Sequence, residues 1–251
     1  IPSCRKSQRE AYGEVYFRAW RAASGPYLDA MEEGCLQDLM FHAVHASTTM
    51  MAAAVRQVLT YTHEQKRQRG VDAMLLKLWN PILFRALKVA NPNVRKNAAT
   101  LFIDAFPLQD ATKPAVELDE ILQSQFNHLT RLLKDDTAVG VRVVAVHGVC
   151  RILALFWDLI PQVTTNSLLA ILVNDLAHDA SANSVRVAVL VGLKYVLAQN
   201  TSTGLVTMLK NLLKPLAPLL HDGSERVRVA FLELLLAVSK LRALPWQSCV
   251  A

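Results

Sequence analysis

Apolar residues along this chain recur every three to four positions, the spacing of one face of an α-helix. The clearest stripe lies in residues 225–242 and comprises Val227, Phe231, Leu234, Val238 and Leu241. Further leucines beside this stripe make the segment apolar on more than one face. Such a helix has to be covered on several sides, and stacked helix pairs cover it because each helix meets its own partner and both neighbouring pairs.

A short motif recurs four times at the start of these apolar runs. It consists of polar turn residues followed by Val-Arg, and its arginines are Arg95, Arg142, Arg186 and Arg228. Their spacings of 47, 44 and 42 residues match the repeat length of HEAT and armadillo proteins, about 40–47 residues. The sequence therefore predicts an all-α fold, a HEAT/armadillo-type α-solenoid of stacked helix pairs.

Helix boundaries follow from proline and turn residues. Proline at the first helical position loses no needed hydrogen bond, so Asn80-Pro81 and Asn91-Pro92 predict two helix starts. The later helix pairs are expected at 116–134 with 138–157, 166–177 with 184–198, and 203–221 with 225–242. The expected organisation is an irregular helical segment or degenerate repeat (1–62), a basic loop (63–70), an array of about four repeats (71–108, 115–157, 166–198 and 203–242), and a tail (243–251).

The recurring arginines favour a structural role. An acidic turn residue precedes each of the last three by six or seven positions, and these acids are Asp136 (or its neighbour Asp135), Asp179 and Asp222. Because equivalent positions line up in adjacent layers of a solenoid, each guanidinium can pair with a carboxylate of its own repeat or of the next. We expect a stacking ladder formed by Asp136, Arg142, Asp179, Arg186, Asp222 and Arg228, and a ligand-binding role is the alternative. At Arg95 an asparagine, Asn91, replaces the acid.

Charge is unevenly distributed along the 251 residues. The chain is 52% hydrophobic, which excludes general disorder, and its net charge is +6. No run of eighteen uncharged apolar residues predicts a membrane span. Residues 51–100 alone contain nine basic and two acidic residues, an excess of +7. An excess of this kind points to an acidic or phosphate-bearing partner.

The basic block supplies candidates for contact with the DNA backbone. The six candidates are Lys66, Arg67, Arg69, Arg85, Lys88 and Lys96. Residues 62–70 contain almost nothing apolar to bury, so we expect the loop charges to be solvated and to form one positive surface with the cations that follow. Aromatic residues are not interleaved among them, which disfavours single-strand recognition and favours a duplex. A solvated face without a ligand is the alternative.

Catalytic and metal-binding patterns are absent from the sequence. It has no phosphate-binding glycine loop, no nucleophile elbow and no HExxH motif. Four cysteines lack metal or disulfide spacing, which predicts reduced thiols. Cys35, His42 and His45 share one expected helix, but a zinc site would need a fourth ligand. We therefore expect no catalysis, metal, cofactor or small-molecule substrate.

Three segments resemble a known family. They read GVDAMLLKLWNPILFRALKVANPNVRKNAATLFIDAFPLQD (70–110), VRVVAVHGVCRILALFWDLIP (141–161) and LVNDLAHDASANSVRVAVLVGLKYVL (172–197). Their sequence motifs, and the order of these motifs along the chain, are similar to those of the non-SMC subunits of the condensin II complex. The family's proteins are much longer, so the resemblance implies that this chain is a fragment of the N-terminal half.

The resemblance implies a non-catalytic HEAT-repeat scaffold located in the nucleus, on chromosomes. Its implied partners are a kleisin subunit, the SMC subunits of condensin II, and double-stranded DNA or chromatin including histones, with no membrane. The implied process is mitotic chromosome condensation and segregation, with ATP turnover in the SMC heads. An adaptor such as a nuclear transport carrier or a phosphatase scaffold is the alternative, because a HEAT fold alone does not decide function. The positive block argues against a carrier of basic cargo.

Overall fold

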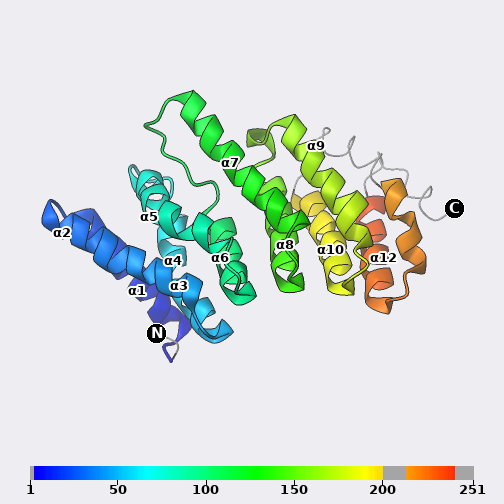
Figure 1. Cartoon of the computed structure of the whole chain (residues 1–251), viewed down its shortest axis with the longest axis horizontal. Coiled ribbons are helices and arrows are strands. Elements are labelled where there is room, and N and C mark those ends of the chain that lie inside the picture. The colour runs from blue at the N-terminus through cyan, green and yellow to red at the C-terminus, as the bar shows by residue number, and fades with distance from the viewer. Residues whose placement is uncertain (1–2, 200–212, 241–251) are drawn as a thin grey trace. The chain divides into compact units, whose positions relative to one another are not determined.

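The computed structural model describes residues 3–199 and 213–240, and every regular element in these ranges is helical (Figure 1). The predicted all-α fold is confirmed. The chain divides into two compact units, unit 1 with residues 1–128 and unit 2 with residues 129–251. In the described ranges, no helix combines the length and the apolar character needed to cross a bilayer.

Unit 1 begins with helices formed by the N-terminal segment that was expected to be irregular. They are α1 (Lys6–Ala22), α2 (Pro26–Asp29), the π-helical segment η1 (Ala30–Gln37), α3 (Asp38–His45) and α4 (Thr49–Glu64). The elements α2, η1 and α3 follow one another without a break, so residues 26–45 form one continuous helical segment. Helix α4 starts at a threonine cap, where Thr48 Oγ1 accepts a hydrogen bond from Met51 N at 3.2 Å.

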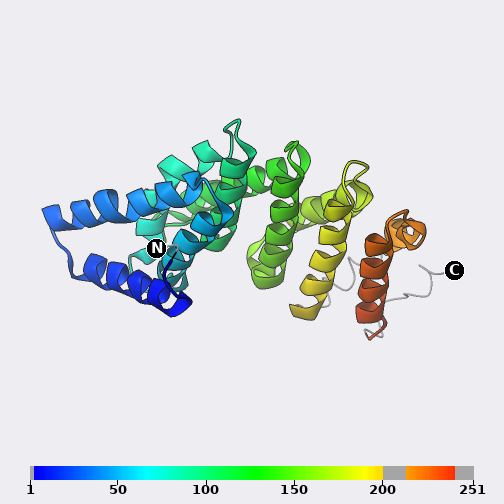
Figure 2. The same cartoon turned by 90° about the horizontal axis from the view of Figure 1, so that it is seen from below.

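Helices α1 and α4 pack side by side at very short range (Figure 2). Phe17 and Trp20 are the buried aromatic residues on the α1 side. Gly13 lies one helical turn before Phe17 on α1. A Cβ atom on Gly13 would stand 2.5 Å from the Val58 carbonyl oxygen of α4. Because backbone atoms cannot yield as a side chain does, this approach requires glycine.

Helices α5 (Val71–Ala86) and α6 (Pro92–Ala105) form the next pair. The predicted start at Asn91-Pro92 is confirmed, and Asn91 Oδ1 accepts a hydrogen bond from Asn93 N at 2.9 Å. The predicted start at Asn80-Pro81 is wrong, because α5 begins at Val71 and contains Pro81. Proline disturbs the backbone hydrogen bonds of the preceding turn. Close to Pro81, Gln37 Nε2 donates to the Leu78 carbonyl at 3.1 Å and ties η1 to α5.

Helix α7 (Ala115–Lys134) closely matches the predicted 116–134, and the division between the two units falls within it, after His128. Its buried residue Gln125 fixes the connection that follows α6. The Gln125 amide accepts a hydrogen bond from Leu108 N at 2.9 Å and donates one to Leu108 O at 2.7 Å.

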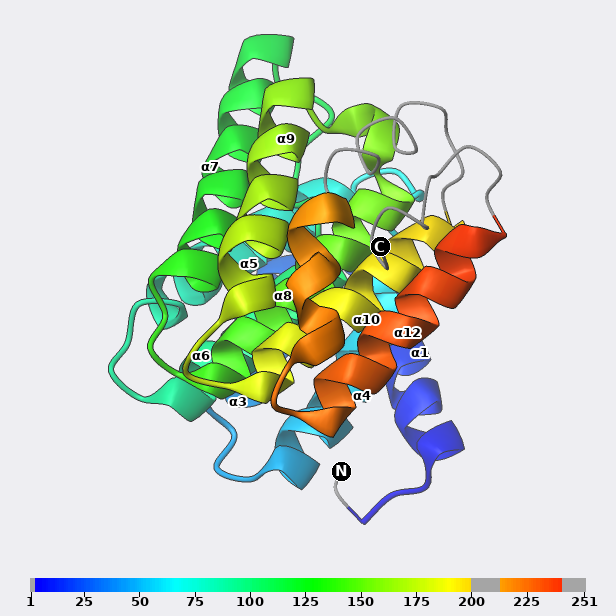
Figure 3. The same cartoon turned by 90° about the vertical axis from the view of Figure 1, so that its right-hand side faces the viewer.

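Unit 2 contains the remaining helical elements, which are α8 (Val139–Leu155), η2 (Trp157–Leu159), α9 (Gln162–Ala170), η3 (Ile171–Asp175), η4 (Leu176–His178), α10 (Asn183–Gln199), η5 (Lys214–His221) and α12 (Glu225–Ser239). Helices α8, α10 and α12, which we call the B helices, lie side by side (Figures 1 and 3). Gly192 of α10 allows this contact, since a Cβ atom there would lie 2.5 Å from Cys150 Sγ of α8.

Two expected helices of unit 2 differ from the structure. The helix expected at 166–177 begins four residues earlier, at Gln162, and passes through π-helical and 3-10 turns before it ends at His178. The helix expected at 203–221 is described only from residue 213, and its residues Lys214–His221 form a 3-10 segment that contains Pro215 and Pro218. Proline removes the backbone donor on which a regular α-helix depends. Residues 203–212, 241 and 242 of the last expected pair lie outside the described ranges, as does the expected tail.

Candidate interaction surfaces

Lys66 lies in the turn between α4 and α5, but its ammonium group points into the protein. Lys66 Nζ donates to the Ala105 carbonyl at 2.6 Å and to the Pro107 carbonyl, and it lies 3.7 Å from Asp72 Oδ1. The side chain is only 18% exposed, and burial lowers the pKa of Lys66 to about 8 although Asp72 opposes the shift. The expectation that the loop charges are all solvated is therefore wrong for Lys66, which is not available as a DNA contact.

The packing of α6 explains this burial. The last carbonyl groups of a helix have no partner within the helix and need a donor from elsewhere. Ala105 is the final residue of α6, and Lys66 supplies a charged donor to it across some forty residues of sequence. The cation is held by backbone atoms and by Asp72, so it acts as a structural tie between two connections of unit 1.

Arg67 and Arg69 of the same turn are exposed. The backbone of Arg69 is tied to α1, since Arg21 Nη1 donates to the Arg69 carbonyl at 3.1 Å. That contact uses no atom of the Arg67 or Arg69 side chain, and the turn therefore presents two cations to solvent.

Arg85, Lys88 and Lys96 are also exposed, but they lie around the turn that joins α5 to α6. This turn is at the other end of α5 from Arg67 and Arg69. A helix of the 16 residues of α5 spans about 24 Å, at about 1.5 Å per residue. The five exposed cations therefore fall into two clusters at the two ends of α5, Arg67 with Arg69 and Arg85 with Lys88 and Lys96, and a single positive surface that joins them stays a prediction.

Two further cations of the basic block are held in ion pairs. Arg56 of α4 bonds the Asp104 carboxylate, with Nη2 3.0 Å from Oδ1. Lys77 Nζ lies 2.6 Å from Glu32 Oε2, and the other oxygen of Glu32 accepts a hydrogen bond from Trp20 Nε1 at 2.9 Å. The hydrogen bond to Glu32, together with its charge, raises the pKa of Lys77. These pairs join elements of unit 1.

Each repeated arginine first contacts the turn of its own repeat through the backbone. Arg142 Nη1 donates to Asp136 O at 2.9 Å, Arg186 Nη1 to Asp179 O at 2.7 Å, and Arg228 Nη1 to Asp222 O at 2.8 Å. The acids use their carboxylates for the turn itself. Asp136, Asp179 and Asp222 each accept from a backbone N–H two residues later, at 2.8 Å. The motif thus closes the turn that begins a B helix.

Two of these arginines, Arg142 and Arg186, also reach the following repeat within unit 2. Arg142 Nη2 lies 3.0 Å from Asp179 Oδ2. Arg186 Nη2 lies 2.9 Å from Asp222 Oδ1, and Arg186 Nε lies 2.9 Å from Asp222 Oδ2. The sequence left open whether each arginine pairs with the carboxylate of its own repeat or of the next. In the structure Arg142 and Arg186 pair with the carboxylate of the next repeat, and within its own repeat each arginine contacts a backbone carbonyl. Arg95 likewise donates through Nη1 to the carbonyls of Val89 and Ala90, at 2.9 and 2.7 Å.

The acids of these pairs are held in the charged form. Burial alone would raise the pKa of Asp179, but hydrogen bonds from Ser181 and Ala182 and the charge of Arg142 outweigh it and lower the pKa. The hydrogen bond from Arg186 is the largest cause of the lowered pKa of Asp222. The ladder therefore consists of ionised pairs at neutral pH.

The B helices of unit 2 also expose a partly apolar surface that the sequence reasoning missed. We call it the B-helix face, formed by His147 of α8, Val191, Lys194 and Tyr195 of α10, and Val229 and Glu233 of α12. Val191 and Tyr195 are 41% and 39% exposed, and Val229 is 47% exposed. Lys194 Nζ pairs with Glu233 Oε2 at 2.7 Å and joins α10 to α12 on this side.

A signal for this face was present in the repeat period. His147, Val191 and Glu233 each follow the ladder arginine of their repeat by five positions, so they occupy equivalent places on successive helices. Burial lowers the pKa of His147, which leaves the imidazole neutral at pH 7. The B-helix face therefore combines aliphatic and aromatic side chains with one ion pair, Lys194 with Glu233.

Ligand sites of other kinds are not evident. Within residues 3–199 and 213–240, no three His, Cys, Asp or Glu side chains gather closely enough to hold a metal ion. Cys4, Cys35 and Cys150 are free thiols, and burial raises the pKa of Cys150 to about 12. Cys249 lies outside the described residues.

Comparison with known proteins gives two family matches. Residues 1–110 match the family described as "Condensin II non structural maintenance of chromosomes subunit", and residues 98–242 match the family described as "GCN1-like, C-terminal HEAT repeats". A designed armadillo repeat protein aligns with 93% of this chain and 92% of its own at 17% identity, with a TM-score of 0.48.

Curated relatives match almost the whole chain. Condensin-2 complex subunit G2 of Homo sapiens is 42% identical over 252 residues, which cover 99% of this chain and 22% of the human protein. The subunit of the same name from Danio rerio is 44% identical over 239 residues, which cover 94% of this chain and 20% of that protein. The chain thus spans about a fifth of the length of these relatives.

Proposed function

We propose, since the chain belongs to the HEAT-repeat proteins and is a homologue of condensin-2 complex subunit G2, that it is a non-catalytic scaffold segment of a condensin II complex. On this proposal it acts on chromosomes in the nucleus during condensation and segregation, together with kleisin and SMC subunits. The relatives are condensin subunits, which disfavours the alternative of a transport or phosphatase adaptor.

The B-helix face is the surface we assign to the kleisin subunit, and its exposed apolar side chains carry this assignment. Interface cores combine aromatic and aliphatic side chains with few unpaired charges. Val191 and Tyr195 lie one helical turn apart on α10, Val229 lies on the neighbouring α12, and the charges of Lys194 and Glu233 neutralise each other. An extended kleisin segment that crosses successive B helices would bury this row of side chains.

Charge substitution on this face is expected to weaken kleisin binding. The Val191→Glu/Tyr195→Glu variant of the full-length subunit places two unpaired carboxylates in the interface, and we expect at least a tenfold weaker affinity. Co-purification with the kleisin subunit and a titration by calorimetry measure the effect.

The matched control for that measurement is Val163→Glu in α9, because Val163 is even more exposed but lies outside the B-helix face. Binding by the control should equal that of the wild type. Equal binding by Val191→Glu/Tyr195→Glu would exclude this face as the kleisin contact.

The two exposed clusters of unit 1 are the surfaces we propose for DNA. Arg85, Lys88 and Lys96 form one cluster, and Arg67 and Arg69 form the other. A duplex presents phosphates along its whole length, so one lying along α5 could contact both clusters. Contacts of this kind depend on counterion release and read little base sequence.

Reversal of these charges should weaken binding to every duplex sequence about equally. We expect the slope of log affinity against log salt to become shallower by about three for Arg85→Glu/Lys88→Glu/Lys96→Glu and by about two for Arg67→Glu/Arg69→Glu, about one unit for each phosphate that the variant no longer neutralises. Salt titrations by fluorescence anisotropy measure both slopes. The control is Arg226→Glu, an exposed arginine of unit 2. A variant that keeps the wild-type slope removes its cluster from the proposal.

A further inference from the structure

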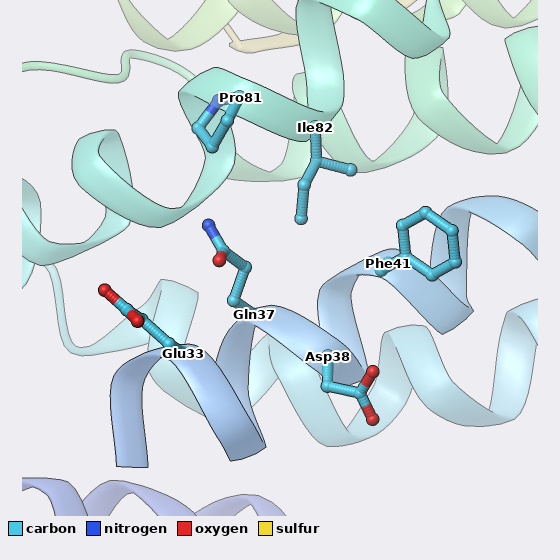
Figure 4. Close-up of a pocket in the computed structure, with 6 residues that line it drawn as sticks. All are labelled: Glu33, Gln37, Asp38, Phe41, Pro81 and Ile82. Carbon is cyan, nitrogen blue, oxygen red and sulfur yellow. The ribbon is translucent and has the colours of Figure 1, made fainter. Parts of the chain in front are cut away.

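A groove in unit 1 lies between the continuous helical segment 26–45 and the turn of α5 that contains Pro81 (Figure 4). Its volume is about 260 Å³, and its lining residues are Glu33, Gln37, Asp38, Phe41, Pro81 and Ile82. Sites for drug-sized molecules usually measure about 300–1,000 Å³. The groove is thus below that range and matches the size of one or two amino-acid side chains.

The floor of the groove is apolar and accessible. Phe41 is 46% exposed, and its ring is steadied by the His45 ring at 4.3 Å between centroids. Ile82 projects from α5 into the space above Gln37 and Phe41 (Figure 4). Gln37 uses its Nε2 to bond the Leu78 carbonyl, so its Oε1 remains as an acceptor near the floor.

The rim of the groove is acidic. Glu33 and Asp38 lie on opposite sides of it in Figure 4. One wall of the groove is formed by residues 33–41, and the surrounding sequence 22–55 contains four acidic residues and no lysine or arginine. Lys77 lies one turn before Pro81, but its charge is matched by Glu32 at 2.6 Å. His42 Nε2 lies 3.6 Å from Asp38 Oδ2 and adds a cation only when protonated.

We propose that this groove docks a short segment of a partner protein that places an apolar side chain against Phe41 and Ile82 and flanking lysine or arginine residues beside Glu33 and Asp38. Charge complementarity selects this occupant, because a cation on either flank meets one carboxylate while the apolar side chain fills the floor. The site lies in unit 1, and its six lining residues belong neither to the B-helix face nor to the DNA clusters, although Arg85 lies one helical turn after Pro81 on α5.

Labelled synthetic peptides test this proposal by fluorescence anisotropy. The first is a nine-residue peptide with a central leucine flanked by lysines, the second has glutamate in place of the lysines, and the third has alanine in place of the leucine. At low salt we expect the leucine–lysine peptide to bind at least tenfold more tightly than either of the others. Phe41→Ala should weaken its binding at least fivefold, and Glu33→Lys/Asp38→Lys should transfer the preference to the glutamate peptide.

The matched control is Glu120→Lys, which reverses an exposed acid of α7 in the same unit and should bind all three peptides as the wild type does. Phe41, Glu33 and Asp38 are exposed, so these variants should fold, and an unchanged melting temperature verifies this. Equal binding by wild type and Phe41→Ala, or no binding of the leucine–lysine peptide at millimolar concentration, would overturn the proposal. Neither outcome affects the kleisin and DNA proposals, because their variants change residues that do not line the groove.

Discussion

Replacement of Lys66 by methionine is expected to lower the free energy of unfolding by about 2–3 kcal/mol, as for other charged groups removed from a buried pair. Methionine fills a similar volume but donates no hydrogen bond. The carbonyls of Ala105 and Pro107 would lose their charged donor, and Asp72 would keep a half-buried carboxyl group without its cation. Urea denaturation of the chain measures the loss.

The control for this experiment is Arg67→Met, the neighbouring cation, which is exposed and should change stability by less than about 0.5 kcal/mol. A second substitution, Asp72→Asn, should restore part of the stability in the Lys66→Met background, because it removes the carboxyl group left without a cation. Non-additivity of the two substitutions would measure their coupling. A Lys66→Met protein as stable as the wild type would mean that the buried ammonium is not a structural tie.

The burial of Lys66 also decides which variants can test DNA binding. Burial of a carboxylate at position 66 beside Asp72 would add like-charge repulsion to a desolvation cost. A loop variant that includes Lys66→Glu would lose stability, and its weaker DNA binding would have no clear cause. Arg67→Glu/Arg69→Glu avoids this ambiguity because both side chains are exposed.

The repeat architecture was readable from the sequence because it depends on local signals. Each turn acid, the Val-Arg that follows and the apolar run lie within about fifteen residues, and α6, α7, α8 and α10 begin within two residues of their expected positions. Pro81 misled the prediction because proline is tolerated inside a helix when other groups compensate. Gln37 contacts the Leu78 carbonyl beside Pro81 from more than forty residues away, and no local pattern reveals that contact.

The candidate sites were less predictable because they depend on contacts between distant segments. Residues 62–70 look like a solvated loop in the sequence, and the burial of Lys66 follows only from where α6 ends. The division of the cations into two clusters was within reach, since the length of α5 sets the distance between its two ends. The correct start of α5, at Val71 instead of Pro81, was the missing fact.

The Arg–Asp ladder leads to the second large effect that we expect. Replacement of Arg186 by alanine should lower the free energy of unfolding by about 1–3 kcal/mol, because the Asp222 carboxylate, only 10% exposed, loses its cation and the Asp179 carbonyl loses a donor. Lysine should not restore the loss, since a single ammonium cannot occupy both places of the guanidinium fork. Thermal and urea denaturation measure both variants, and Arg226→Ala on the exposed side of α12 is the matched control.

The pH dependence of this effect separates an ion pair from simple packing. The pKa of Asp222 is lowered in the folded protein, so the stabilisation by the pair is fully present above the ordinary carboxyl pKa and is lost as the pH falls through the lower folded pKa. The difference between wild type and Arg186→Ala should therefore shrink in acid, whereas a packing loss would persist. DNA affinity should stay unchanged at neutral pH. If Arg186→Ala instead lost DNA affinity with an unchanged melting temperature, the repeated arginines would be phosphate contacts and the ladder interpretation would be wrong.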